Sequence, residues 1–337
     1  MNRAALALVA MTAACGGPPR TARVPVEIPP GTTLQAAVDS LAAHAVVRHP
    51  SLFLAYARAR GLRGELKSGD YLLPEGARWN DIVAALTRGR GIEVRWTVPE
   101  GLMLPEVAAL AETELGIPRD SFLAAAGDPA LRQALALPTG SATVEGYLFP
   151  TTYVLPVHIG ARELVQVMTR AFQDAWQADW QNRLDSLHWT RHQAVTLASI
   201  IEAEVRYDPD RPFVSAVYHN RLARGMKLEA DPTVIYAFGH RLKRVWDKDL
   251  LIASPYNTYL HPGLPPGPIA EPGRASLLAA LNPAPFPFLY FVAQPDGKHI
   301  FSVTLPEHEA AVRTVKRLQA AGREPQPRDP AHPTLRP

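Results

Sequence analysis

Short β-prone segments alternate with amphipathic helices between residues 23 and 92. In the helical segments, apolar residues recur three or four positions apart, which is the spacing of one face of a helix. In order, the chain gives a strand over Val24–Ile28, a helix with Leu34, Val38 and Leu41 on one face, a helix over Leu52–Arg60, a strand over 69–73, and a helix with Trp79, Ile82, Val83 and Leu86 on one face. Helices and strands mixed in this way predict a small α+β module over residues 23–92.

A strand end, a turn and a helix start recur three times with similar residues at the turn. The copies are Ile28-Pro29-Pro30-Gly31, Leu73-Pro74-Glu75-Gly76 and Val98-Pro99-Glu100-Gly101. Proline and glycine are favoured in such connections between a strand and a helix. Because the third copy follows a break at 89–91 and a β-prone segment, it predicts the start of a larger α+β domain over residues 93–320.

The N-terminal end of the chain differs in composition from the rest. Met1-Asn2-Arg3 and the apolar run Ala4–Ala14 have the charged start and short core of an export signal, and the run is shorter than the roughly 20 residues that span a bilayer. It ends in Ala13-Ala14-Cys15-Gly16, which resembles the lipobox of bacterial lipoproteins. Residues 1–22 are therefore predicted to be an export signal and tether that anchor the protein to a membrane of the cell envelope through Cys15, with the larger domain outside the cytoplasm. An uncleaved or conventionally cleaved signal is the alternative.

Composition and motif spacing exclude several functional classes. The formal net charge of +3, with a pI near 9.0, does not indicate nucleic-acid binding. The single cysteine allows no intramolecular disulfide, and the Pro-rich residues 321–337 are predicted to be a disordered tail. His261, His299 and His308 lack metal-ligand spacing, and the chain has neither a Gly-rich phosphate loop nor a Gly-x-Ser-x-Gly elbow. We therefore expect no metal and no cofactor.

Two threonines are placed to begin helices. Thr32, with Gln35 three positions later, predicts a capping box in which each side chain bonds a free backbone N–H. Thr190 precedes the strongly helical segment Arg191–Arg206 and is its predicted N-cap.

This second helix carries the candidate catalytic residue. On a helix, Glu202 shares a mostly apolar strip with Val195 and Ala198. A carboxyl among apolar groups is expected to have a raised pKa and to donate a proton near neutral pH. Glu204 lies about 200° further round the helix, so the two glutamates do not form a two-carboxylate pair. Taken alone, a solvated glutamate on an amphipathic helix is the alternative for either residue.

Polar residues held by proline and glycine crowd the chain beyond this helix. The segments are Tyr218–Leu222, Gly225–Tyr236, Ser254–Tyr259, Gly263–Ile269, Glu271-Pro272-Gly273 and Gly297–Phe301. Aromatic rings stack on sugars and amides bond their hydroxyls, so rigid loops of this composition suit a carbohydrate site.

Several ordered blocks give the chain a specific family resemblance. They are EGYLFPTTY over Glu145–Tyr153, LASIIEAE over Leu197–Glu204, HNRL, DPTVIY, SPYNTY, GLPPGPI and GKHIF. Together they resemble the endolytic murein transglycosylases, the YceG-like or MltG-type proteins, over residues 93–320. The module over 23–92 is similar to the family's LysM-like module, for which glycan binding and a purely structural role both remain open. The short predicted signal stands where the family has a transmembrane helix.

The resemblance implies a reaction and its central residue. In the family the catalytic group is the first glutamate of an Ile/Val-Glu-x-Glu motif, which falls on Glu202, and Glu204 is carried over as a supporting residue. Glu202 would protonate the glycosidic oxygen between N-acetylmuramic acid and N-acetylglucosamine, then accept the proton of the muramyl C6 hydroxyl as that hydroxyl attacks the anomeric carbon. The product is a 1,6-anhydro end, and one carboxyl suffices because the nucleophile belongs to the substrate. The implied partners are peptidoglycan glycan strands and, for ending nascent strands, peptidoglycan synthases.

Further residues are predicted to bind or orient the substrate. They are Glu145, Tyr147, Glu204, Asn220, Asp231, Tyr256, Asn257, Thr258 and His299. Stabilising a loop is the alternative for Asn220, Asp231, Tyr256 and Asn257, since asparagine and aspartate serve well in caps and turns. Glu145 is either a carboxylate of the cleft or the partner of a nearby arginine.

Two other functions remain open at this point. One is a hydrolytic muramidase, in which a second carboxylate such as Asp231 or Glu145 activates water. The other is a non-catalytic wall-binding scaffold of the division or elongation machinery.

Overall fold

The computed structural model describes residues 23–89, 92–157, 159–242 and 244–321, which divide into two compact units. The first unit holds the described residues up to Val98 together with Ala111–Ile117 and Thr152–Glu163. The second holds Pro99–Leu110, Pro118–Thr151 and the residues from Leu164 onward. The predicted signal with Cys15, and the predicted tail from residue 322, lie outside the described residues. In the described ranges, no helix has the length and apolar content needed to cross a membrane.

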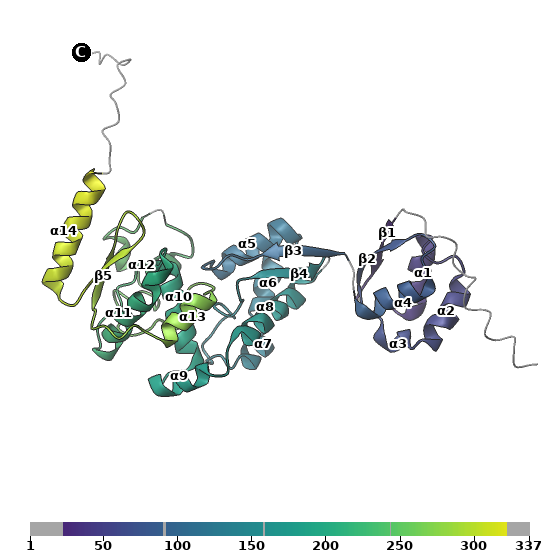
Figure 1. The fold of residues 1–337 in the computed structure, drawn as a ribbon, viewed down its shortest axis with the longest axis horizontal. Coiled ribbons are helices and arrows are strands. Elements are labelled where there is room, and N and C mark those ends of the chain that lie inside the picture. Colours follow the sequence, from purple (N-terminus) through teal and green to yellow (C-terminus); the bar gives the residue numbers. More distant parts are fainter. Residues whose placement is uncertain (1–22, 90–91, 158, 243, 322–337) are drawn as a thin grey trace, which may run out of the picture. The chain divides into compact units, whose positions relative to one another are not determined.

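The first unit combines two antiparallel strand pairs with short helices (Figure 1). Its elements are β1 Arg23–Ile28, α1 Leu34–Ala43, α2 Pro50–Ala59, α3 Leu62–Glu65, β2 Gly69–Pro74, α4 Trp79–Arg88, β3 Glu93–Thr97 and β4 Thr152–Pro156. Strand β1 pairs with β2, and β3 pairs with β4. The predicted mixture of helix and strand, the α+β class, is confirmed.

The apolar faces predicted from spacing form the core of this unit. Val26 and Ile28 of β1, Leu41 of α1, Phe53 of α2 and Ile82 of α4 are all at most 1% exposed. Burying a side chain of this size contributes roughly 1.5–3 kcal/mol. Packing of these faces therefore positions the helices against the β1–β2 pair.

The three repeated turns lie between a strand and a helix, as the sequence predicted. Gly31, Gly76 and Gly101 have φ values of +79°, +63° and +77°, which L side chains rarely adopt. The predicted capping box at Thr32 is wrong, because the Thr32 hydroxyl donates to the Pro29 carbonyl and the N-cap is the next residue, Thr33.

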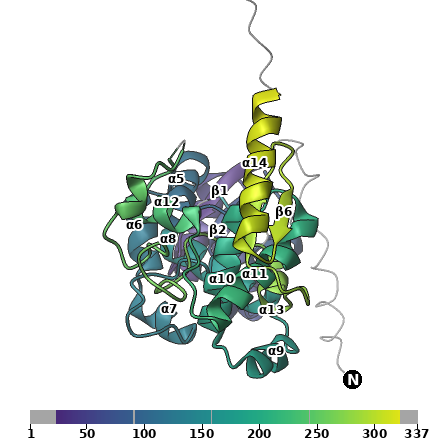
Figure 2. The same ribbon diagram turned by 90° about the vertical axis from the view of Figure 1, so that its left-hand side faces the viewer.

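The second unit is mainly helical. Its elements are α5 Leu104–Leu115, α6 Arg119–Ala126, α7 Pro129–Ala134, α8 Ala161–Ala175, α9 Trp180–Leu187, α10 Arg191–Glu204, η2 Asp208–Asp210, α11 Arg211–Ala223, α12 Asp231–Phe238, η3 Asp249–Leu251, α13 Arg274–Leu281, β5 Tyr290–Ala293, β6 His299–Ser302 and α14 Leu305–Ala321. The end of α5, from Ala111, and the start of α8, up to Glu163, belong to the first unit. Figure 2 shows α10, α11 and α13 close together, and α14 running beside the β5–β6 pair.

Helix α10 is the buried centre of this unit. Every residue from Ala194 to Ile201 is buried, so the helix is covered on all sides. The Thr190 hydroxyl accepts from the Gln193 N–H while the Gln193 side chain accepts from the Thr190 N–H, which confirms Thr190 as the N-cap. Burial and capping fix the position of the last turn, which carries Glu202.

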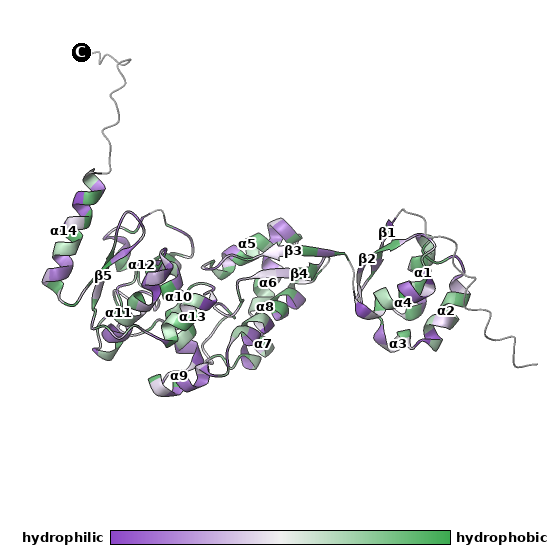
Figure 3. Ribbon diagram, viewed as in Figure 1, coloured by the Kyte–Doolittle hydropathy of each residue, from purple (hydrophilic) through white to green (hydrophobic). Residues whose placement is uncertain are grey.

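Helix α14 packs on the β5–β6 pair along one narrow face. Ala311 and Val315 are buried, whereas Leu305 and Leu318 are 51% and 48% exposed. Figure 3 shows alternating hydrophilic and hydrophobic bands along this helix. A helix with this pattern covers a sheet on one side and meets solvent on the other.

Candidate active site

Glu202 forms a buried ion pair at the end of α10. Its Oε1 lies 3.1 Å from Nη1 of Arg211, and its Oε2 accepts a hydrogen bond from the Gly273 N–H at 3.0 Å. The side chains of Glu202 and Arg211 are 6% and 8% exposed. Arg211 also pairs with Asp208 at 3.1 Å and donates to the Ser276 hydroxyl. Both carboxyl oxygens of Glu202 are therefore held by groups from other segments.

The surroundings of Glu202 differ from those the sequence predicted. Val195 and Ala198 on its strip are fully buried, as expected. Arg211 in addition places a guanidinium beside the carboxyl, a neighbour that the mostly apolar strip did not indicate. The apolar strip describes one face of α10 and cannot show which side chain of a later helix packs onto it.

Two turns that are distant in sequence meet beside Glu202. The Gly101 N–H donates to the Glu271 carbonyl and the Glu271 N–H donates to the Leu102 carbonyl, both at 2.8 Å. These bonds join the third Pro-Glu-Gly turn to the Glu271-Pro-Gly273 turn. If Gly101 carried a Cβ, that atom would lie 3.5 Å from Cγ of Glu202, so the stem of Glu202 lies close to this turn.

Glu100, which the sequence indicated only as a turn residue, also reaches this point. Its carboxyl lies against Gly273, since a Cβ added to Gly273 would overlap the Glu100 carboxyl atoms. Gly273 is the residue whose N–H bonds Glu202. Burial, followed by the negative charge of Glu202, raises the pKa of Glu100, while Arg211 acts in the opposite direction.

Two further carboxyl groups are buried together in the second unit. Glu145 accepts hydrogen bonds from the Leu104 N–H and the Tyr236 hydroxyl, both at 2.7 Å, and is 7% exposed. Glu271 is fully buried and accepts from the Leu148 N–H at 2.9 Å. Burial raises the pKa of Glu145 to about 7 and that of Glu271 well above its usual range. Neither hydrogen-bond donor to Glu145 is an arginine.

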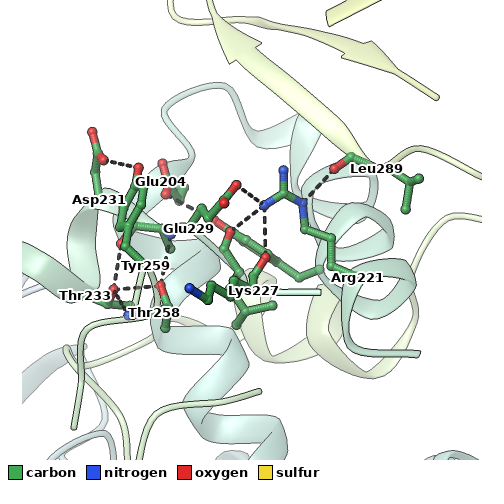
Figure 4. Close-up of polar contacts among 12 residues, drawn as sticks. Glu204, Arg221, Lys227, Glu229, Asp231, Thr233, Thr258, Tyr259 and Leu289 are labelled. Atoms are coloured by element: carbon green, nitrogen blue, oxygen red, sulfur yellow. Dashed lines mark hydrogen bonds and ion pairs between the residues drawn. The ribbon is translucent and has the colours of Figure 1, made fainter. Parts of the chain in front are cut away.

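Glu204 and Asp231 face a separate set of hydroxyl groups (Figure 4). The Tyr218 hydroxyl donates to Glu204 at 3.1 Å, and the Tyr259 hydroxyl donates to Asp231 at 2.7 Å. Burial, followed by the charge of Asp231, raises the pKa of Glu204 to about 7. Glu202 and Glu204 thus have different partners, as their angular separation on the helix predicted.

Three of the predicted substrate residues hold loops through their side chains. Asn220 donates to two carbonyls of the 286–288 segment at 2.8 and 2.9 Å. Asn257 is 0% exposed and donates to two carbonyls of the 250–252 segment, both at 2.9 Å. Thr258 is 1% exposed, and its hydroxyl oxygen accepts a hydrogen bond from the Ala230 N–H at 3.0 Å. These contacts correspond to the loop-stabilising alternative for Asn220 and Asn257, and direct glycan contact by the three stays a prediction.

The remaining predicted residues lie in separate places. The buried Tyr147 hydroxyl is 3.1 Å from Nδ1 of His192, which lies on α10. Tyr256 packs its ring at 4.7 Å from a tyrosine ring of α12. His299 on β6 lies 3.0 Å from the Asp210 carboxylate through Nδ1, and its side chain is 2% exposed. His299 thereby connects β6 to the segment that precedes Arg211.

A groove of about 450 Å³ adjoins the first turns of α10. The residues that line it are Trp189, His192, Gln193, Thr196, Leu222, Gly263, Leu264, Pro265 and Pro266. Its volume is in the usual range for small-ligand sites. In the part of the chain that the structure describes, no cluster of three or more His, Cys, Asp or Glu residues is arranged to hold a metal ion.

Comparison with known proteins assigns the family. The model of the YceG-like family matches residues 26–314, which is most of the chain. The chain belongs to the YceG-like family. The crystal structure of a YceG-like protein from Listeria monocytogenes superposes with a TM-score of 0.61 at 32% identity, covering 86% of this chain and 99% of that one.

Curated relatives of this YceG-like chain carry an enzyme name. It is 33% identical over 305 residues to the endolytic murein transglycosylase of Bacillus subtilis (strain 168), covering 86% of this chain and 83% of that protein. It is 28% identical over 319 residues to the endolytic murein transglycosylase of Streptococcus pneumoniae serotype 2 (strain D39), of which it spans 58%.

The YceG-like site contains groups that the sequence did not identify. Arg211 and Gly273 bond Glu202, and the Glu100 carboxyl lies against Gly273, yet these three residues come from segments far apart in the chain. The motif Glu271-Pro-Gly273 and the third repeated turn were both visible as turns. Their pairing depends on tertiary contacts, which carry no local sequence signal.

The buried carboxyl of Glu145 predicts a pH-dependent stability. Its folded-state pKa, about 7, lies above the usual 4.5, so the folded protein keeps a proton that the unfolded chain releases in this interval. Protonated Glu145 therefore makes its full contribution to the free energy of unfolding below pH 4.5. This contribution, on the order of 3 kcal/mol, is lost as the pH rises to about 7. In Glu145→Gln, which mimics the protonated acid, the free energy of unfolding should fall less over this range.

Urea unfolding at intervals from below pH 4.5 to above pH 7 measures this effect. Glu114→Gln, on the exposed face of α5, is the matched control and should keep the wild-type slope. An unchanged slope in Glu145→Gln would contradict the prediction.

Proposed function

We propose that this chain is an endolytic murein transglycosylase whose catalytic group is Glu202. It cleaves the bond between N-acetylmuramic acid and N-acetylglucosamine in peptidoglycan strands without water and leaves 1,6-anhydro ends. The observation that carries the catalytic assignment is the shielded Glu202 carboxyl at the end of α10, held on both oxygens, in a chain of the YceG-like family. Proteins with this enzyme name align over 86% of the chain.

In the proposed reaction, Glu202 serves first as acid and then as base. The protonated carboxyl donates to the glycosidic oxygen, whose bond to the muramyl anomeric carbon breaks with the electron pair moving to that oxygen. The muramyl C6 hydroxyl then bonds the anomeric carbon and gives its proton to the Glu202 carboxylate. The guanidinium of Arg211 and the N–H of Gly273 fix the carboxyl orientation, which places the proton relative to the substrate.

The glycan is proposed to contact the exposed residues of the second unit. Asp231 is exposed beside Tyr259, and Tyr256 is half-buried. The groove beside α10 offers Trp189 for stacking and Gln193 for hydroxyl groups. Buried residues such as Asn257 and Thr258 contribute to the site by holding the loops that carry these side chains.

The protein is further proposed to work in the cell envelope, attached to a membrane through its N-terminus, with Cys15 as the lipid attachment point. Residues 93–320 form the proposed catalytic domain, and residues 23–92 form a LysM-like module that engages glycan. Because the proposed enzyme cuts glycan strands internally, its proposed cellular role is to end nascent strands beside peptidoglycan synthases.

Analysis of the ends produced from purified sacculi tests this function. The expected products carry 1,6-anhydro-N-acetylmuramic acid, detected by mass spectrometry after complete digestion of the strands. Reducing ends instead would indicate the hydrolytic muramidase, and strands that are bound but not cut would indicate the wall-binding scaffold. Either result contradicts the proposal.

A further inference from the structure

The surroundings of Glu202 raise the question of where the catalytic proton is held before reaction. In the structure, Oε1 of Glu202 faces the Arg211 guanidinium and Oε2 accepts from the Gly273 N–H. Both partners are hydrogen-bond donors, and neither is an acid that could supply a proton near neutral pH. A neighbouring carboxyl group is therefore the candidate source of the proton for the glycosidic oxygen.

Glu100 is the carboxyl group placed to store it. It belongs to the turn that two 2.8 Å backbone bonds join to the 271–273 turn, and its carboxyl lies on Gly273. Gly273 thus has the Glu100 carboxyl against its Cα and the Glu202 carboxyl on its N–H. A side chain at position 273 would separate or displace the two acids, since even a Cβ would overlap Glu100.

The charges around Glu100 favour its protonated form. The groups that act on it from the packed segments are Glu202 of α10, Asp208 of η2 and Arg211 of α11. Partial burial and the two carboxylates raise the pKa of Glu100, and only Arg211 opposes them. Two interacting carboxyl groups ionise one after the other, because the first charge disfavours the second. The guanidinium of Arg211 forms its ion pair with Glu202.

We propose that Glu100 and Glu202 share one proton across Gly273, and that Glu100 holds it in the free enzyme and supplies it to Glu202 when glycan binds. This role rests on the proposed function of Glu202. The proton passes from Glu100 to Glu202 and on to the glycosidic oxygen as that bond breaks. The C6 hydroxyl proton then passes to Glu202 as the new bond forms, and from there back to Glu100. At the end of the cycle the two carboxyl groups again hold one proton between them. Glu100 does not touch the substrate in this scheme and acts through Glu202, as a positioning residue.

The test compares Glu100→Gln and Glu100→Asp with wild type in strand cleavage over a range of pH. In Glu100→Gln, kcat near neutral pH should fall by about 10²-fold or more with KM unchanged, because Glu202 must then take its proton from solvent. The pH optimum should move to lower pH for the same reason. Glu100→Asp, which keeps a carboxyl, should recover part of the rate.

Glu114→Gln, an exposed glutamate on α5, is the matched control for the loss of one carboxylate. It should keep the wild-type kcat and pH optimum, and thermal unfolding should show all three variants folded, Glu100 being an exposed side chain. A wild-type rate and pH optimum in Glu100→Gln overturns the shared proton, even when Glu202→Gln is inactive. Full activity in Glu202→Gln instead overturns the proposed function itself. If wild type produces reducing ends and Glu100→Gln does not, Glu100 activates water for hydrolysis. That result also overturns the shared proton.

Discussion

Glu202→Gln is expected to lower the rate of glycan-strand cleavage by about 10²–10⁴-fold, the usual contribution of a positioned proton donor and acceptor. Glutamine has nearly the same shape, and its amide oxygen can still accept from the Gly273 N–H at the position of Oε2. It cannot donate to a glycosidic oxygen as an acid or accept the C6 hydroxyl proton as a base. The loss should therefore appear in kcat, with glycan binding retained.

The measurement is release of soluble muropeptides from purified sacculi, with binding followed by co-sedimentation. Glu163→Gln on α8, an exposed glutamate, is the control for a generic loss of one negative charge. If Glu202→Gln cuts strands within a few-fold of the wild-type rate, the acid and base must be another residue.

The sequence was sufficient for structural features that depend on neighbouring residues. The turns at Gly31, Gly76 and Gly101 lie between a strand and a helix, as predicted, because proline and glycine favour such connections locally. Thr190 is the predicted N-cap of α10, and the structure adds Gln193 as its capping partner. At the first helix the same reasoning placed the cap one residue early, since Thr32 and Thr33 are both able to cap and the hydroxyl of Thr32 closes the preceding turn instead.

The site depends on contacts between distant segments, and these had no local signal. The helical angle correctly separated Glu202 from Glu204, because both positions are on one helix. The partner of Glu202, however, is Arg211, which follows the short η2 turn in the next helix. Asn257 was predicted as a sugar ligand from the family resemblance and its residue type. Its buried side chain donates to two main-chain carbonyls of its own loop, and direct glycan contact stays a prediction.

Arg211→Met is expected to lower the free energy of unfolding by about 3–5 kcal/mol, because it leaves the Glu202 charge buried without its cation. Methionine preserves much of the arginine stem, so the loss arises from the missing guanidinium and its bonds to Glu202, Asp208 and Ser276. Urea unfolding at neutral pH measures it. Arg224→Met, an exposed arginine at the end of the same helix, is the matched control and should change stability by less than about 0.5 kcal/mol.

The double variant Arg211→Met/Glu202→Gln separates the two functions of this ion pair. Removing both charges should return a large part of the lost stability, because a neutral amide costs less to bury than an unpaired carboxylate. A coupling energy near zero in this double-mutant cycle would contradict a buried pair. Activity should remain absent in the double variant. A pair that can be replaced by neutral groups at small cost to folding, but not without loss of catalysis, serves the reaction, because the guanidinium of Arg211 orients the Glu202 carboxyl.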